Sequence, residues 1–100
     1  MEFVNAIAKV RFASAKPQRV QLHKGPDLLA ELLCLEPGQK VQVDGGQWLY
    51  YVITGNAAIT DGKTTTQLSA GRFAASEDHR HAIASADDRR LIVLAATAVK

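Results

Sequence analysis

Turn signals recur at short intervals along this chain of 100 residues, and their spacing excludes most helical folds. In chain order the signals are Gly25–Pro26, Pro37–Gly38, Gly45–Gly46, Gly55–Asn56, Asp61–Gly62, Gly71 and Asp87–Asp88. The segments between them have the length of strands, and short strands with frequent turns are typical of sandwiches and barrels. The sequence therefore predicts one all-β domain over residues 1–100, a small antiparallel β-barrel.

The residue patterns within these segments support strands. Val41 and Val43 alternate with polar neighbours, which is the period of a half-buried strand. Residues 48–53 form an aromatic and β-branched run that favours a central strand. Asp61–Gly62 separates two further segments and is a strong hairpin signal. The expected strands are residues 40–44, 48–53, 57–60, 63–68 and the buried closing strand 91–96.

Two segments are ambiguous. Residues 27–35 contain good helix formers and start with Asp, yet they are short and end just before Pro37–Gly38, so helix and strand are equally favoured. Residues 3–12 place apolar side chains at alternate positions, which fits a strand or a short irregular turn. We therefore describe residues 1–26 as N-terminal strands or an arm, and residues 28–97 as the core of the barrel.

Charge and cysteine content limit the partners. The net charge is +2, and no basic stripe with interleaved aromatic residues is present, so we expect no nucleic-acid partner. Cys34 is the only cysteine and lies in an apolar run, which predicts a buried, inert thiol.

Residues 1–5 lack the features of a signal peptide, and no apolar stretch approaches the roughly 20 residues of a membrane span. We expect a cytoplasmic protein with no membrane partner.

Several short motifs follow one another in a specific order. They are Leu35–Glu36–Pro37–Gly38–Gln39, Tyr50–Tyr51–Val52–Ile53–Thr54–Gly55, Asp61–Gly62, Leu68–Ser69–Ala70–Gly71, His81 and Leu91–Ile92–Val93–Leu94. In order and spacing, residues 33–97 resemble a small single-domain cupin of the cupin-2-like, RmlC-like type. This resemblance implies a double-stranded β-helix, or jelly roll, in which residues 28–35 form a strand. It also implies a homodimer.

The resemblance implies that barrels of this type carry a metal site, and this chain departs from the motif that forms that site. The family motif consists of H-x-H, a glutamate and a later histidine. The two imidazoles of H-x-H point the same way, because they are two positions apart on a strand. Here Asp44 and Gly46 stand at the two histidine positions, and Trp48 stands at the glutamate position. Only His81 remains, so the resemblance implies a degenerate motif without a metal cofactor.

A rebuilt metal site is the alternative. His79 and His81 would share a face on a strand, and with Asp44 they could bind a divalent transition metal. Arg80 beside them would repel a cation. On this alternative the protein is a metal-dependent cupin enzyme, isomerase-like or dioxygenase-like.

The aromatic strand divides its side chains between two faces. Trp48 and Tyr50 lie on one face and Leu49 and Tyr51 on the other, because successive residues of a strand alternate. We expect the first pair inside the barrel. The interior candidates for ligand binding are Asp44, Trp48, Tyr50 and His81.

The preferred function is a metal-free, non-catalytic barrel that binds a small molecule or serves a structural role as a homodimer. Trp48 replaces a charged ligand by apolar filling, which disfavours an ion there. Residues 3–12 or the outward face of residues 48–53 are the candidate dimer surfaces. The residues identify no catalytic group, ligand or reaction.

Overall fold

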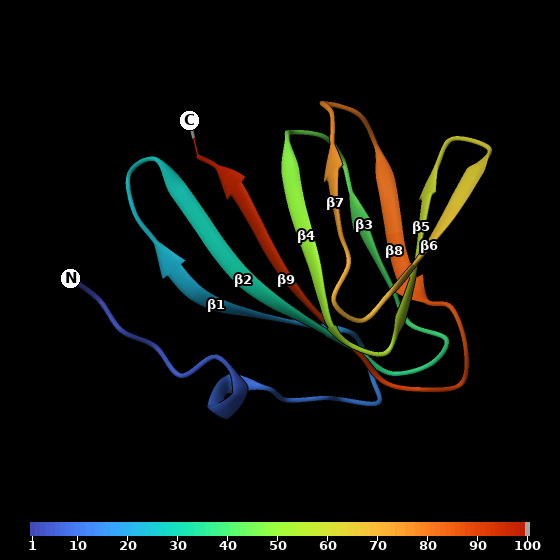
Figure 1. Cartoon of the computed structure of the whole chain (residues 1–100), viewed down its shortest axis with the longest axis horizontal. Coiled ribbons are helices and arrows are strands. Elements are labelled where there is room, and N and C mark those ends of the chain that lie inside the picture. Colours follow the sequence, from blue (N-terminus) through green and yellow to red (C-terminus); the bar gives the residue numbers. More distant parts are fainter. Residues whose placement is uncertain (100) are drawn as a thin grey trace.

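The computed structural model describes residues 1–99, in which nine strands form two antiparallel sheets (Figure 1). The strands are β1 Gln18–Lys24, β2 Leu28–Leu35, β3 Lys40–Val43, β4 Trp48–Thr54, β5 Asn56–Asp61, β6 Thr64–Ser69, β7 Phe73–Ser76, β8 His81–Ser85 and β9 Leu91–Ala98. One sheet has the order β1-β2-β9-β4-β7, which we name sheet A, and the other has the order β3-β8-β5-β6, which we name sheet B. The predicted all-β jelly roll is confirmed.

The main core lies between the two sheets and follows from strand alternation. In β4 the buried residues are Trp48, Tyr50 and Val52, while Leu49 and Tyr51 are exposed. Val41 and Val43 face the same core from sheet B. The predicted central strand, closing strand and hairpin are present, and Gly62 begins the hairpin turn with a φ of 62°. Positive φ at the first turn residue suits the twist of the two strands.

Strand β2 resolves the ambiguity at residues 27–35. It is hydrogen-bonded on both sides, to β1 and to β9, and four consecutive residues from Leu32 to Leu35 are fully buried. A helix would bury only one stripe of such a segment, whereas a central strand covered on both faces buries every residue. Cys34 is among the buried residues, as the sequence predicts.

The N-terminal segment forms a turn and not a strand. Residues Ile7–Lys9 make a short 3₁₀ helix, η1, in which the Asn5 side chain accepts a hydrogen bond from the Ala8 amide at 3.3 Å. Ala6, Val10 and Phe12 pack on the outer face of sheet A, over a second apolar cluster that includes Cys34. This segment therefore covers the β1–β2 side of the outer face. No helix within residues 1–99 is long and apolar enough to cross a membrane.

Candidate functional site

A pocket of about 420 Å³ opens between the two sheets. Strands β4 and β7 of sheet A form one wall, and the β5–β6 hairpin and the start of β8 form the other. Its apolar floor contains Ile59, Leu68 and Ala74. Its polar lining is contributed by Tyr50, Asp61, Thr64, Thr66, Ser76, His79 and His81. An apolar body with a few polar groups is the usual composition of a small-molecule site.

His81 and Tyr50 form a buried pair at the base of this pocket. Their side chains are almost fully buried, and the Tyr50 hydroxyl lies 2.6 Å from Nε2 of His81. The other ring nitrogen, Nδ1, lies 3.0 Å from the backbone oxygen of His79. A carbonyl can only accept, so Nδ1 carries the proton in neutral His81 and Nε2 accepts from the Tyr50 hydroxyl. Both nitrogens of His81 are thus used within the chain.

Trp48 extends this pair into an aromatic row. Its ring is parallel to that of Tyr50, with centroids 5.9 Å apart, and the ring of His81 meets Tyr50 edge-on at 5.5 Å. The Trp48 indole nitrogen donates to the backbone oxygen of Gly45 at 3.2 Å. Burial raises the pKa of Tyr50 well above its usual range, with a smaller opposing effect of Arg19. The phenol is therefore neutral and acts as a donor to His81.

An ion pair that the sequence analysis did not identify borders this row. Arg19 on β1 donates from Nε and Nη2 to Oε1 of Glu31 on β2, at 2.9 and 2.5 Å. The Arg19 guanidinium also lies 5.7 Å from the centre of the Trp48 ring, as a cation–π contact. Glu31 is buried. A single carboxylate within the apolar run of residues 28–35 was the signal that could have indicated it.

Contrary to the expectation from the sequence, Asp44 does not lie in the interior with Trp48, Tyr50 and His81. The Asp44 side chain is 87% exposed, and its Oδ1 lies 3.9 Å from Nε of Arg80. The reason is alternation: Val43, the last residue of β3, points into the core, so the next side chain points outward.

His79 lies on the loop before β8 and pairs with the β5–β6 hairpin. Its Nε2 is 2.8 Å from Oδ2 of Asp61, and both side chains are about half exposed. The three members of the alternative metal set thus have three different partners: Arg80 for Asp44, Asp61 for His79 and Tyr50 for His81.

The residues present do not fit the divalent metal that the resemblance implies for such barrels. The ring nitrogens of His81 are engaged, and Trp48 fills the position of the carboxylate ligand. Within residues 1–99, no cluster of three or more His, Cys, Asp or Glu side chains has a geometry that could hold a metal ion.

Comparisons with known proteins agree with the architecture. No protein-family model matches the sequence, and no curated protein matches it significantly. Among solved structures, a protein of Thermus thermophilus superposes with a TM-score of 0.89 at 22% identity, covering 98% of this chain and 97% of the other. An uncharacterised conserved protein with a double-stranded β-helix domain from Klebsiella pneumoniae gives 0.87 at 21% identity, with coverages of 98% and 90%.

A third structure carries the family name itself. A cupin superfamily protein of Desulfitobacterium hafniense gives a TM-score of 0.82 at 21% identity, covering 100% of this chain and 94% of the other. Two facing antiparallel sheets with this strand order define a double-stranded β-helix. More particularly, this chain has the fold of a small cupin domain.

Proposed function

We propose that this protein binds a small organic molecule in the pocket between the two sheets, without a metal and without catalysing a reaction. The observation that carries the proposal is the pocket itself, about 420 Å³ with the buried Tyr50–His81 pair at its base. Small barrels have room for one small ligand or for side chains only, and here a cavity remains between the two sheets. The pocket volume lies within the range of ligand sites.

The metal-dependent enzyme is the weaker candidate. It needs His79, His81 and Asp44 on one ion, and each of these side chains is directed to a different partner. Freeing His81 would leave the Tyr50 hydroxyl without its acceptor in a buried site, which costs about 1–3 kcal/mol. Ligand binding requires no such rearrangement.

Fragment screening by protein-observed NMR tests the proposal. The probes are fragments with one small apolar body and one or two hydroxyl, amine, carbonyl or carboxylate groups. We expect some of them to shift the amide resonances of Leu68 and Ala74, which line the pocket.

Two leucine variants locate the binding. Ala74→Leu fills the pocket and should abolish these shifts, whereas Ala58→Leu adds the same bulk to a residue of β5 that does not line it. Circular dichroism establishes that both variants are folded. If no fragment shifts the pocket resonances, or if Ala74→Leu binds as the wild type does, the proposed function is wrong.

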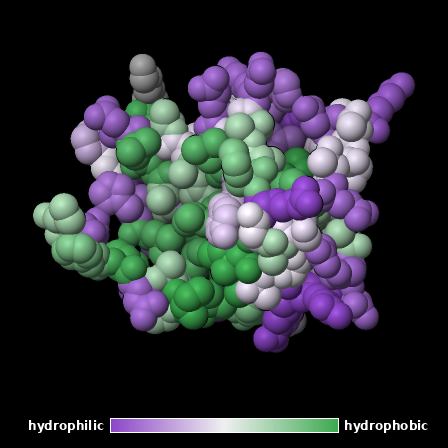
Figure 2. Space-filling model, in the orientation of Figure 1, coloured by the Kyte–Doolittle hydropathy of each residue, from purple (hydrophilic) through white to green (hydrophobic). Residues whose placement is uncertain are grey.

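We also propose that the outer face of sheet A is a homodimer interface. Leu49, Tyr51 and Phe73 are 53%, 44% and 68% exposed, and with Leu94 and Ala96 they line an almost wholly apolar hollow of about 260 Å³. Figure 2 shows this hydrophobic area over β4 and β9, continuing toward the N-terminal segment. Contiguous exposed apolar surface of this kind marks an interaction site.

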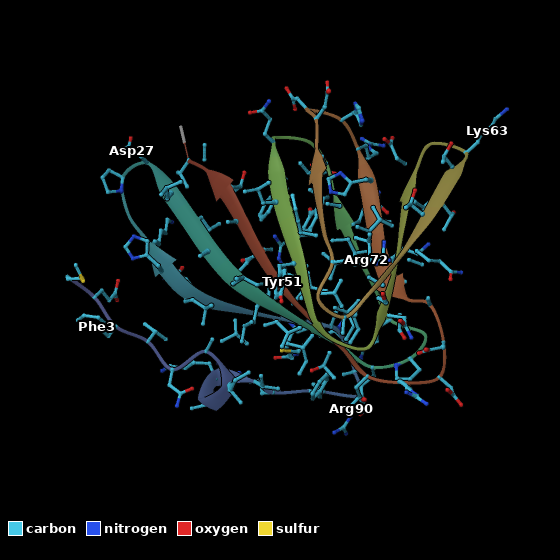
Figure 3. All side chains as sticks on the ribbon, viewed as in Figure 1. Phe3, Asp27, Tyr51, Lys63, Arg72 and Arg90 are labelled. Carbon is cyan, nitrogen blue, oxygen red and sulfur yellow. The ribbon has the colours of Figure 1, made fainter. Side chains whose placement is uncertain are left out.

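A second copy is the partner that fits this face best. Among the described residues no charged one lines the hollow, so the same face on another copy meets it without like-charge repulsion, as a two-fold interface requires. The protein's own N-terminal segment does not cover it, because a 2.6 Å contact between Glu2 and His23 holds that segment at β1, the opposite edge of sheet A from β7. Figure 3 shows Phe3 on the β1 side of the molecule, far from the β5–β6 hairpin that carries Lys63.

Sedimentation equilibrium tests the dimer. We expect a dimer at micromolar concentration for the wild type and a monomer for Phe73→Lys, which introduces a charge on the outer face of sheet A. Gln67→Lys, at an exposed position of β6, is the matched control and should stay dimeric. A monomeric wild type at that concentration, or a dimeric Phe73→Lys variant, would refute the interface.

A further inference from the structure

The polar groups of the pocket differ in the charge and the hydrogen-bonding role that they present to a ligand, and this difference indicates a class of ligand. On the basis of the proposed function, we propose that the pocket selects a small amine in its cationic form over neutral and anionic molecules of the same shape. The carrying features are the orientation of the Tyr50 hydroxyl and the position of the Asp61 carboxylate.

Tyr50 presents an acceptor to the pocket. In neutral His81, Nδ1 donates to the His79 carbonyl, and Nε2 is then the acceptor for the Tyr50 hydroxyl hydrogen. The hydrogen is therefore directed at His81, and the remaining lone pair of the phenol oxygen is what a ligand can meet. Burial keeps Tyr50 neutral, because it raises the pKa of the phenol.

Asp61 supplies negative charge at the rim. It is the only carboxylate that lines the pocket, and no Lys or Arg side chain lines it within the described part of the chain. One oxygen, Oδ2, accepts from His79 at 2.8 Å. An ionised carboxylate has about four acceptor positions, so this contact leaves capacity for a ligand N–H. Asp61 is 54% exposed, and solvent weakens its attraction without removing it.

The other lining groups do not oppose this assignment. The Ser76 hydroxyl oxygen accepts from the Trp48 amide at 3.2 Å, and hydroxyls such as those of Thr64 and Thr66 can rotate to donate or accept. An apolar ligand body would contact Ile59 and Leu68. An anionic ligand would find repulsion from Asp61 and, within the described part of the chain, no lining Lys or Arg to offset its loss of water.

Three aromatic probes of similar size test the proposal: benzylamine, benzyl alcohol and benzoate, each titrated into the 100-residue chain and followed by NMR at the pocket resonances. We expect benzylamine to bind about three- to tenfold more tightly than benzyl alcohol, as for a partly solvated charge-assisted hydrogen bond, and benzoate to bind most weakly.

Charge variants assign the preference to Asp61. Asp61→Asn should bring benzylamine and benzyl alcohol to about the same affinity. Asp88→Asn, which neutralises a carboxylate on the loop between β8 and β9 and outside the pocket lining, should keep the wild-type preference.

The outcomes separate the two proposals. If benzoate or benzyl alcohol binds at the pocket as tightly as benzylamine, the amine preference is wrong while the small-molecule site stands. If the preference survives Asp61→Asn, the assignment to this carboxylate is wrong. If none of these probes or of the fragments binds at the pocket, the proposed function is wrong, and so is this inference, which depends on it.

Discussion

The Tyr50 hydroxyl and Nε2 of His81 lie 2.6 Å apart in the interior, on strands of different sheets, and each satisfies the hydrogen-bonding group of the other. This contact joins sheet A to sheet B below the pocket. It also engages His81, the one histidine that this chain retains of the metal motif implied by the resemblance.

Removing the Tyr50 hydroxyl should therefore destabilise the protein. Tyr50→Phe leaves the buried Nε2 of His81 without a donor, and we expect a loss of about 1–3 kcal/mol in the free energy of unfolding, measured by urea titration. Tyr51→Phe is the matched control, because the exposed Tyr51 belongs to the opposite face of β4. Its stability should stay within about 0.5 kcal/mol of the wild type. Equal effects of the two variants would contradict the assigned contact.

Stability should fall at high pH through the same phenol. Burial raises the pKa of Tyr50 above its ordinary value of 10.0, so above that pH the unfolded chain loses this proton while the folded protein keeps it. The contribution of Tyr50 is thus complete below pH 10.0 and is lost as the pH rises beyond it. Unfolding free energies across this range should decline more steeply for the wild type than for Tyr50→Phe, by at most about 1.4 kcal/mol per pH unit. Parallel curves for the two proteins would show that Tyr50 titrates normally.

Gly55 should tolerate no side chain. Its φ is +91°, and a Cβ there would clash with the backbone oxygen of Arg90 and lie 3.2 Å from Cα of Leu91. Gly38 has nearly the same φ, +88°, with nothing within 4 Å of an added Cβ. Gly38→Ala should cost about 1 kcal/mol for the backbone conformation alone, and Gly55→Ala should cost at least about 2 kcal/mol more, by urea unfolding. Similar losses would mean that the segment preceding β9 can move away.

Removing only Arg19 from the Arg19–Glu31 pair should destabilise the protein more than replacing both residues by apolar ones. Arg19→Met leaves the buried Glu31 carboxylate without its cation, and we expect a loss of about 1–3 kcal/mol, reduced from the value of a fully buried pair because Arg19 is 41% exposed. The double variant Arg19→Met/Glu31→Leu should recover most of that loss, since apolar side chains suit this interior. A double variant less stable than Arg19→Met would show that the pair itself stabilises the fold.

Local patterns were sufficient to predict much of this protein. Alternating and apolar runs between turn residues located β3, β4, β9 and the β5–β6 hairpin, because side-chain direction in a strand depends only on position. The same rule correctly separated Trp48 and Tyr50 from Leu49 and Tyr51. It could also have excluded Asp44 from the interior, since Val43 beside it already faces inward. The resemblance, and not the local propensity, assigned residues 28–35 to a strand.

What the sequence by itself determined was five of the strands, β3, β4, β5, β6 and β9, and the inward face of β4, since turns and alternation act between neighbours in the chain. The tertiary structure decided the partners: Tyr50 with His81, Arg19 with Glu31, and His79 with Asp61. These contacts join residues 31, 12 and 18 positions apart. Their formation depends on which strands pair and how the two sheets face each other, and no local pattern carries that information.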